Sequence, residues 1–295
     1  MELRQVRYFV GVAETLSFRQ ASKHLYVSQP SLSVQIKQLE DELGVSLLRR
    51  SKRGVEITRA GEVFLPRARE ILLKLKQASA AAQHAENGEA GTVRLGFIPT
   101  AGFHILPRLL DKIRSILPLV NVELKEGPEA LQIPGLESGA FDISIGHLGE
   151  SHDRIESMLL IREPIVVALP KGHKAARKKT VASKDLEGEL FMIPSKDLFP
   201  SLHQLIATAF VQNHVPLKRY QMVEHFQTAV ALTMARAGFA FLPASAKSFV
   251  PEGVVLRAPS FRIRPLETFA LWSNGNVDPL IQRVLSLLKE VRRDL

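Results

Sequence analysis

The sequence of 295 residues contains no cysteine. Disulfide bonds, thiolate metal sites and cysteine nucleophiles are therefore excluded, and the composition fits a reducing compartment. Long apolar stretches are also missing, since no run reaches the roughly 18 residues that a transmembrane helix needs. The N-terminal segment carries Glu2, Arg4 and Arg7 where a signal peptide has its apolar core. We expect a cytoplasmic protein without a membrane partner.

Acidic residues are fewer than basic ones, at 30 against 39, which gives a formal net charge of +9. This excess favours a polyanionic partner such as nucleic acid, although it is shared between the two halves of the chain. The length and the hydrophobic content of 45% allow two or three domains. No phosphate-binding glycine loop, zinc-protease helix or nucleophile elbow occurs. The sequence therefore predicts no enzyme, no cofactor and no metal site.

Two short helices joined by a turn are predicted near the N-terminus. Ser17 can begin the first helix in a reciprocal capping box with Gln20. Ser28 and Pro30 suit the first turn of the second helix, and Gly44 suits its end. Apolar residues recur at helical spacing in both helices: Phe18, Ala21, Ser22 and Leu25 in the first, and Leu32, Ile36, Leu39 and Leu43 in the second. Packing on these stripes leaves one face of the second helix free.

Short hydrogen-bonding side chains occupy that free face near the start of the second helix, where backbone amides also favour phosphate. The residues that we expect to contact DNA there are Gln29, Pro30, Ser31, Ser33 and Lys37. A hairpin is predicted at 47–58, with Arg50, Lys52 and Arg53 ahead of Gly54 to bind phosphates. The alternatives are a polar outer face on an ordinary three-helix subdomain and a solvated basic turn.

Many residues between Leu3 and Gly61 match a known family at fixed spacing: Tyr8-Phe9-Val10, Ser17-Phe18, Ala21, Leu25, Val27-Ser28-Gln29-Pro30, Leu32-Ser33, Gln35-Ile36, Leu39-Glu40, Leu43-Gly44, Leu47, Arg50, Thr58 and Ala60-Gly61. On these residues the segment resembles the N-terminal domain of the LysR-type transcriptional regulators. The resemblance implies a winged helix-turn-helix that binds double-stranded DNA. Val34 and Leu48 depart from the family, which often has Arg and Phe there, so Val34 is not counted as a DNA contact.

A heptad pattern follows the hairpin, from a capping position at Thr58 to a polar hinge at 86–91. Its a and d positions are Phe64, Ala68, Ile71, Leu75, Ala78 and Ala82. The pattern covers fewer than three heptads, so a single packed helix is the alternative to a coiled coil. Pro66 is expected to kink the helix. The family resemblance implies that this segment is a dimerising linker helix, with contacts through Phe64, Ile71, Leu75 and Ala78.

From Thr92 onward, short β-branched segments alternate with helical stripes, as in α/β domains with mainly parallel strands. The predicted strands and helices are 93–97, 120–124, 142–145, 165–169, 191–193 and 239–242, and 105–117 and 278–291. The stretch from Gly91 resembles the effector domain of the same family, through matches such as Leu95-Gly96, Asp142, Val167-Ala168-Leu169-Pro170 and Leu242-Pro243-Ala244-Ser245. The resemblance implies two periplasmic-binding-protein-like α/β lobes, at about 91–161 with 267–295 and at about 162–266. The predicted domains are therefore 1–58, 59–90 and 91–295.

Ligands of open α/β sheets bind beyond the carboxyl ends of the strands. The candidate ligand-binding residues in those loops are Thr100, Ala101, Phe103, Pro128, His147, Ser195, His225, Phe226 and Gln227. At 99–103, a hydroxyl and free amides at a helix N-terminus would suit a carboxylate, with a plain capping threonine as the alternative. Pro128 stands where the branch of the family that senses aromatic acids often has a side-chain hydroxyl. His147 stands where it often has Arg, and a histidine near its reference pKa of about 6.5 would hold an anion less firmly. A buried core histidine is the alternative.

The resemblance implies a sequence-specific transcriptional regulator, closest to the branch that senses aromatic acids or their ring-cleavage products. Its implied partners are double-stranded DNA, a small organic acid inducer, further copies of the chain in a homodimer or homotetramer, and RNA polymerase. An activator is expected, with autorepression as a second mode. Two other classes stay open: an architectural DNA-binding protein without a ligand, and a solute-binding protein or enzyme built on the same lobes.

Overall fold

Three helices, a β-hairpin and a long fourth helix form the N-terminal part of the computed structural model, which describes residues 1–51, 54–148, 152–215, 218–275 and 278–295. These elements are α1 (Leu3–Thr15), α2 (Phe18–His24), α3 (Gln29–Leu43), β1 (Leu48–Ser51), β2 (Gly54–Ile57) and α4 (Arg59–Glu86). The described chain divides into two compact units, Met1–His84 and Ala85–Leu295. We call the first unit the head and the second the effector unit.

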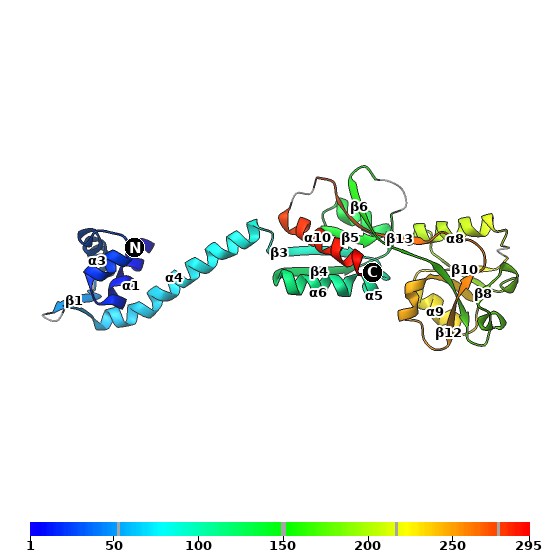
Figure 1. Cartoon of the computed structure of the whole chain (residues 1–295), viewed down its shortest axis with the longest axis horizontal. Helices are drawn as coiled ribbons and strands as arrows, with labels where there is room; N and C mark the ends of the chain where they lie inside the picture. The colour runs from blue at the N-terminus through cyan, green and yellow to red at the C-terminus, as the bar shows by residue number, and fades with distance from the viewer. Residues whose placement is uncertain (52–53, 149–151, 216–217, 276–277) are drawn as a thin grey trace. The chain divides into compact units, whose positions relative to one another are not determined.

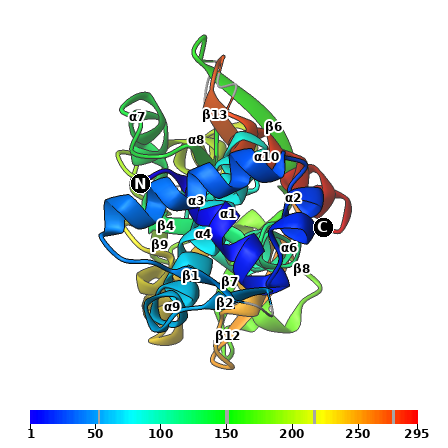
Figure 2. The ribbon, with the colours of Figure 1, turned by 90° about the vertical axis from the view of Figure 1, so that its left-hand side faces the viewer.

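Local signals set the helix boundaries in the head, whose helices and hairpin are seen in Figure 2. Ser17 Oγ accepts a hydrogen bond from the Gln20 N–H at 3.3 Å, and Ser28 Oγ accepts one from the Ser31 N–H at the same distance. Gly44 ends α3 in the left-handed conformation, with φ of 70°. The predicted capping box at Ser17 is only half present, because the exposed Gln20 side chain makes no return bond within the described chain.

The core of the head lies between α1 and α3. Leu32, Ile36 and Leu39 are fully buried there against Phe9, among other residues of α1. Leu43 was predicted in the same stripe but is 36% exposed, since it is the last residue of α3 and lies beyond this core. The predicted three-helix packing is otherwise confirmed.

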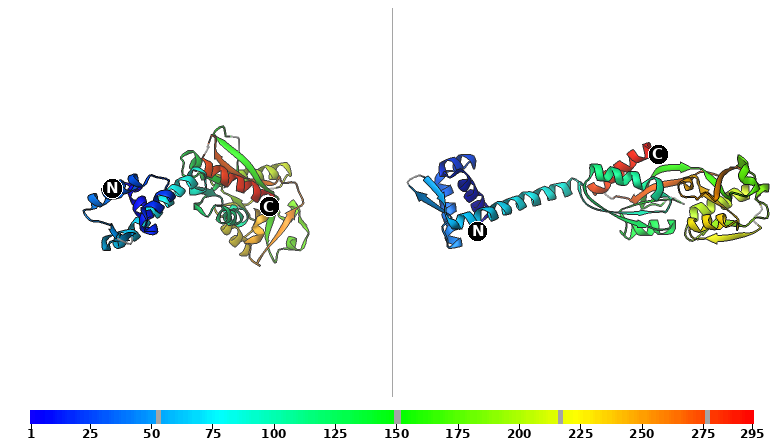
Figure 3. Two further views of the ribbon diagram at one scale, coloured as in Figure 1. Left: turned by 60° about the vertical axis from the view of Figure 1, so that its left-hand side comes forward. Right: turned by 90° about the horizontal axis from the view of Figure 1, so that it is seen from below.

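The long helix α4 continues directly from the hairpin (Figure 3). Thr58 Oγ1 accepts a hydrogen bond from the Gly61 N–H at 3.1 Å and donates one to the Ser46 carbonyl at 2.6 Å. Gly61 lies against the hairpin so closely that an added Cβ would be 2.2 Å from the Leu47 carbonyl oxygen. Only glycine fits at this position, and Thr58 caps the helix as predicted. Pro66 lies inside the helix.

The effector unit contains two sheets with helices against them. The first sheet has the strand order β4-β3-β5-β13-β6, formed by β3 (Ala90–Phe97), β4 (Leu119–Glu126), β5 (Ile143–Gly146), β6 (Ile155–Glu163) and β13 (Leu266–Ser273). Its helices are α5 (Ala101–His104), α6 (Leu106–Ile116), α7 (Gln132–Glu137) and α10 (Pro279–Arg293), with the short 3-10 helix η1 (Glu129–Leu131). Figure 1 shows α6 and α10 beside β3 and β4. We call this part lobe I.

Lobe II is built on the second sheet, with the strand order β10-β9-β11-β7-β12-β8. Its strands are β7 (Ile165–Pro170), β8 (Thr180–Val181), β9 (Phe191–Pro194), β10 (Tyr220–Val223), β11 (Phe239–Pro243) and β12 (Val254–Pro259). Its helices are α8 (Pro200–Gln212) and α9 (Phe226–Met234), with the 3-10 helices η2 (Lys174–Arg177), η3 (Ser183–Asp185) and η4 (Ala244–Ser248). The chain passes between the lobes from β6 to β7 and returns from β12 to β13. This architecture confirms the predicted fold class.

All the predicted strands are present, but the sheets are less parallel than expected. β13 runs antiparallel to both β5 and β6, and β7 runs antiparallel to both β11 and β12. These two strands carry the chain into and out of lobe II, so they run against the parallel strands beside them. The strands β6, β8, β10, β12 and β13 and the helices α8 and α9 were not predicted.

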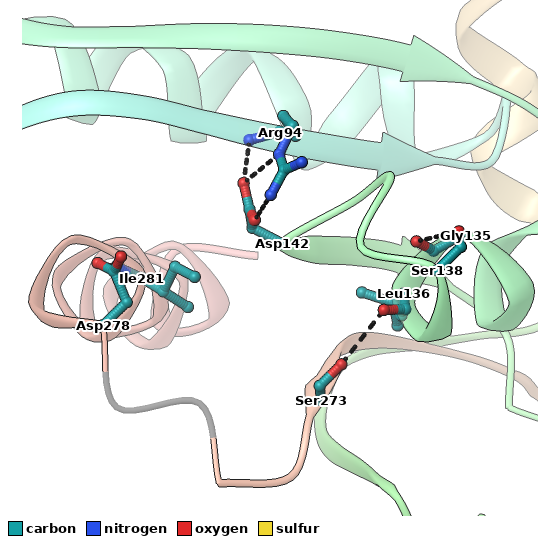
Figure 4. A network of polar contacts seen from close by, with 8 residues as sticks. All are labelled: Arg94, Gly135, Leu136, Ser138, Asp142, Ser273, Asp278 and Ile281. Atoms are coloured by element: carbon teal, nitrogen blue, oxygen red, sulfur yellow. Dashed lines mark hydrogen bonds and ion pairs between the residues drawn. The ribbon is translucent and has the colours of Figure 1, made fainter.

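An ion pair ties the start of lobe I together (Figure 4). Asp142, directly before β5, accepts hydrogen bonds from the backbone N–H of Arg94 at 2.7 Å and from its Nε at 3.0 Å, and a further one from Nη2. Asp142 thus fixes β5 against β3. At the C-terminal helix, Asp278 Oδ1 accepts a hydrogen bond from the Leu280 N–H at 2.8 Å, which confirms the predicted start of α10.

Within the described residues, no helix combines the length and apolar character needed to cross a membrane.

Candidate DNA interface and ligand-binding cleft

A groove of about 550 Å³ lies between α3 and the first strand of the hairpin. Ser33, Lys37 and Arg50 line it, so the structure brings these three predicted DNA contacts together. Gln29, Pro30 and Ser31 are exposed in the first turn of α3. Lys52 and Arg53, predicted to bind phosphates, lie outside the described residues.

Arg50 is positioned by two neighbours in the head. Its Nη2 is 3.5 Å from Ser33 Oγ, and its guanidinium carbon is 5.5 Å from the centre of the Phe18 ring. No carboxylate within the described chain pairs with Arg50, whereas Arg49 forms an ion pair with Glu56 at 2.8 Å. Glu56 therefore neutralises the charge of Arg49, whereas the charge of Arg50 is not neutralised within the described chain.

Glu40 fixes the hairpin to α3. Its Oε1 accepts hydrogen bonds from the N–H groups of Leu47 and Leu48 at 2.7 and 2.9 Å. These bonds hold the base of the hairpin, and so the groove wall, against α3. Sequence reasoning gave Glu40 no role, although it lies in the matched Leu39-Glu40 pair.

The heptad positions of α4 divide into two groups. The Phe64 ring packs on Phe9 with ring centres 5.3 Å apart, and Ala68 is fully buried in the core of the head. Phe64, predicted as a dimer contact, is thus partly used inside the head, because the first turns of α4 cover its core. Ile71 and Leu75 are each 37% exposed, and Ala78 is exposed. These three residues, which we call the α4 seam, remain available for a partner.

The two lobes of the effector unit touch at α5 and η4. Phe103 of lobe I stacks on Phe249, just after η4, with ring centres 4.8 Å apart. Next to it, His104 Nε2 is 3.2 Å from the Ser245 carbonyl oxygen. Phe103 was predicted as a ligand contact, and the structure places it in this contact between the lobes, where it is still 45% exposed.

A second contact between the lobes joins η1 to the start of α8. The two carboxylate oxygens of Glu129 accept hydrogen bonds from the Ser201 N–H at 3.0 and 3.2 Å, and the Ala130 N–H donates to the Leu198 carbonyl at 3.2 Å. Glu129 therefore caps a helix of the other lobe and complements its dipole. It is only 7% exposed, and burial raises the pKa of its carboxyl. Sequence reasoning missed this residue, since nothing local in the sequence pairs it with Ser201.

The loop at 99–103 differs from its prediction. The N–H groups of Ala101, Gly102 and Phe103 donate to carbonyls three residues earlier, so these amides are not free for a carboxylate. The tight turns at the start of α5 use them. Thr100 does not cap the helix with its side chain, and its hydroxyl has no hydrogen-bond partner within the described chain. Thr100 and Ala101 are 5% and 2% exposed.

The other predicted ligand-binding residues are spread over several surroundings. His147 lines a groove between the lobes and is 3% exposed, with Nδ1 3.0 Å from the Glu267 carbonyl oxygen. Burial lowers its pKa to about 4, which agrees with the alternative of a buried core histidine and not with a side chain near 6.5. The remaining residues are placed as follows: Pro128 half-buried before η1, Ser195 buried after β9, His225 and Gln227 exposed at the start of α9, and Phe226 buried in lobe II beside Phe199.

The sequence profile of bacterial regulatory helix-turn-helix proteins of the lysR family matches residues 3–62, and that of the LysR substrate binding domain matches residues 86–293. The chain belongs to the LysR family. Among its relatives, this LysR-family protein is 34% identical to the transcriptional regulator AlsR of Bacillus subtilis, over 97% of this chain and 95% of AlsR. It is 30% identical to the Hca operon transcriptional activator HcaR of Escherichia coli, over 98% of both chains.

Solved structures of LysR regulators extend this likeness to the fold. The crystal structure of CbnR superimposes with a TM-score of 0.86 at 27% identity, covering 98% of this chain and all of CbnR. Full-length CbnR complexed with its target DNA gives a TM-score of 0.84 at 28% identity, covering 99% of this chain and all of CbnR. The LysR-family protein described here is a DNA-binding transcriptional regulator and not an enzyme.

The Arg50→Gln variant is expected to weaken binding to all DNA sequences and to reduce the slope of log affinity against log salt by about 0.9, the value for one lost phosphate contact. The reason is that Arg50 borders the α3 groove without a carboxylate partner. Fluorescence anisotropy at several salt concentrations measures the slope. Arg49→Gln is the matched control, since Glu56 already neutralises Arg49, and equal slopes for both variants would contradict the assignment.

Glu129→Ala is expected to lower the free energy of unfolding of the effector unit by about 1–3 kcal/mol, because it leaves the Ser201 N–H without its acceptor. Chemical denaturation of the purified protein measures this loss. Glu129→Gln keeps an acceptor oxygen and should recover most of it. Glu126→Ala, at an exposed position nearby, should stay within about 0.5 kcal/mol of the wild type. A loss of the same size at both positions would show that Glu129 does not join the lobes.

Proposed function

We propose that this LysR-family regulator controls transcription in response to a small organic acid bound between lobes I and II. Activation is its main output, with autorepression as a second mode. The resemblance noted in the sequence supports an inducer from the branch that senses aromatic acids or their ring-cleavage products. The relative HcaR, an operon activator, supports the direction of control. RNA polymerase is then a further partner, and the cytoplasm is the place of action.

The observation that carries the inducer proposal is the groove between the lobes. It has a volume of about 880 Å³, within the usual range for small-molecule sites, and residues of both lobes line it. Two arginines, Arg262 and Arg264, lie along it, and the carboxylate in its described lining, Glu267, is paired with Arg162 at 2.6 Å. A concave site with positive side chains suits an organic anion better than a neutral or cationic molecule.

On the DNA side, we propose that Gln29, Pro30, Ser31 and Ser33 approach the bases and that Lys37, Arg50, Lys52 and Arg53 contact phosphates. The α4 seam supplies the contact for a homodimer, and two dimers form a homotetramer. The predicted division into 1–58, 59–90 and 91–295 then corresponds to DNA binding, dimerisation and ligand binding.

Ligand and DNA are coupled by linkage in this proposal. The lobes touch at two places, the Glu129–Ser201 bonds and the Phe103–Phe249 stack, and an acid between them changes the free energy of this closed arrangement. In the oligomer, the closed arrangement of the lobes favours one spacing of the DNA-binding heads. A ligand that stabilises closed lobes therefore shifts the equilibrium of the oligomer toward that spacing. The inducer thereby changes how DNA is bound without being chemically altered.

The experiment that tests this proposal is a DNase footprint on the region upstream of the regulator's own gene. It is repeated with a panel of aromatic and dicarboxylic acids. A protected site that shortens or moves with one acid supports the proposal and gives the inducer class. A footprint that no acid changes would favour an architectural DNA-binding protein.

A further inference from the structure

The groove between the lobes has a wall whose hydrogen-bonding character is fixed by the backbone. His147, at the end of β5, donates its Nδ1–H to the Glu267 carbonyl oxygen at 3.0 Å. A carbonyl oxygen can only accept, so Nδ1 carries the ring proton. The side chain is 3% exposed, and Nε2 has no hydrogen-bond partner within the described chain.

This arrangement makes Nε2 of His147 an acceptor. A neutral imidazole with its proton on Nδ1 has a lone pair on Nε2, and burial, which lowers the pKa of His147 to about 4, keeps the ring neutral at physiological pH. A carboxylate oxygen placed against Nε2 would meet a second lone pair. A hydroxyl group of a ligand would instead donate its hydrogen to Nε2 and supply the donor that this nitrogen lacks.

Positive charge lies farther along the same groove. Arg262 and Arg264 are exposed, and neither pairs with a carboxylate within the described chain. The acid nearest to them along the chain, Glu267, is already held by Arg162, with Nε and Oε1 2.6 Å apart. The two arginines are therefore available to the carboxylate of a ligand.

The acceptor and the cations are separated by a distance that limits the ligand. Arg264 precedes Glu267, the backbone partner of His147, by three residues, which span at most about 10 Å. Arg262 lies beyond it, where its carbonyl accepts from Asn213 Nδ2 just after the end of α8. His147 and Arg264 both line the groove, and this short span along the chain keeps them in the same part of it, so one small ligand can contact both.

We propose that the inducer of this regulator is a hydroxylated organic acid, whose hydroxyl donates to Nε2 of His147 and whose carboxylate binds Arg264, with Arg262 adding to the positive field. This inference rests on the proposed function, in which the groove holds the inducer, and it adds the chemical class. The site selects against dicarboxylic acids of the same length, because their second carboxylate would face the lone pair of His147.

Isothermal titration of the full-length protein with three para-substituted benzoates tests the inference. The probes are 4-hydroxybenzoate, 4-methoxybenzoate, which keeps the oxygen but lacks the hydrogen, and terephthalate, which replaces the hydroxyl by a carboxylate. We expect 4-hydroxybenzoate to bind about tenfold more tightly than either of the others, as for one buried hydrogen bond gained or lost.

Two variants separate the two ends of the ligand. His147→Leu should bring the affinities for 4-hydroxybenzoate and 4-methoxybenzoate close together. The readout is the ratio of these two affinities, which a general loss of affinity leaves unchanged. Arg264→Gln, at an exposed position, should weaken all three acids and keep the preference for the hydroxyl. It also tests the inference if His147→Leu does not fold.

Equal binding of the three acids by the wild type, or a hydroxyl preference that persists in His147→Leu, overturns the inference. Tighter binding of terephthalate together with a changed DNase footprint overturns it but leaves the proposed function intact. If none of these acids binds and no aromatic or dicarboxylic acid changes the footprint, both the inference and the inducer proposal fail.

Discussion

Leu75→Asp is expected to lower the affinity for an operator with two half-sites by about 100-fold or more, which is the gain that linking two binding modules commonly provides. Leu75 lies on the α4 seam and is 37% exposed, as is Ile71. A carboxylate at this position would be buried without a partner if two seams packed together. Sedimentation measures the loss of the dimer, and anisotropy on one-site and two-site DNA measures the loss of linkage.

Leu73→Asp is the matched control for this variant. Leu73 is an apolar residue of the same helix, 55% exposed, but it lies off the heptad positions. It should leave the dimer and the two-site affinity close to those of the wild type. A dimer that survives Leu75→Asp, or that is lost equally in both variants, would contradict the seam as the contact. Affinity for a single half-site should be unchanged in Leu75→Asp, because the core of the head does not include Leu75.

The head could be predicted from the sequence because its signals are short-range. Ser28 caps α3 through a residue three positions away, and Gly44 ends the helix through its own backbone conformation. The buried stripe of α3 also follows from spacing alone. The bonds from Glu40 to the hairpin span seven and eight residues and lie outside any periodic pattern, so they could not be predicted.

The effector unit was predicted less completely, for a physical reason that α8 illustrates. Its apolar residues are not confined to the buried face, since Leu205 borders the groove and Val211 is 77% exposed, so the contrast between an apolar and a polar face is low. Pro200 in its first turn was the signal that could have been used, as Pro279 was for α10. The edge strand β10, with most of its side chains exposed, likewise lacks the apolar pattern of a buried strand.

The contacts around the groove between the lobes could not be predicted from the sequence. Glu129 and Ser201 are 72 residues apart, and the Nδ1–H of His147 finds its acceptor 120 residues away. The sequence suggested His147 as a ligand contact, with a buried core histidine as the alternative, and the structure places it buried on the wall of the groove between the lobes. A ring near its reference pKa would be weakly cationic. Burial, together with the Glu267 carbonyl, reverses that character into a neutral acceptor. The hydrogen-bonding character of this side chain thus depends on tertiary contacts more than on residue type.

The buried state of His147 also predicts an acid-sensitive effector unit. The pKa of His147 falls from 6.5 to about 4 on folding, so as pH drops the unfolded chain takes up a proton before the folded chain does. The stabilising contribution is complete above about pH 6.5 and is lost as pH falls toward 4, by about 3 kcal/mol in total at 1.36 kcal/mol for each pH unit. Urea unfolding at a series of pH values between 4 and 7.5 measures this loss.

The difference between the wild type and His147→Leu isolates this contribution, because carboxyl groups titrate in the same range in both proteins. Glu129 is one of them and acts in the opposite direction: burial raises its pKa, so protonation on acidification favours the folded lobes. The wild type should lose stability relative to His147→Leu as pH falls from 6.5 to 4. His225→Leu, at an exposed histidine of the same unit, should retain the acid sensitivity of the wild type. A constant difference between wild type and His147→Leu over this range would mean that His147 accepts a proton as readily in the folded chain as in the unfolded one, and the acceptor role of Nε2 would then be wrong.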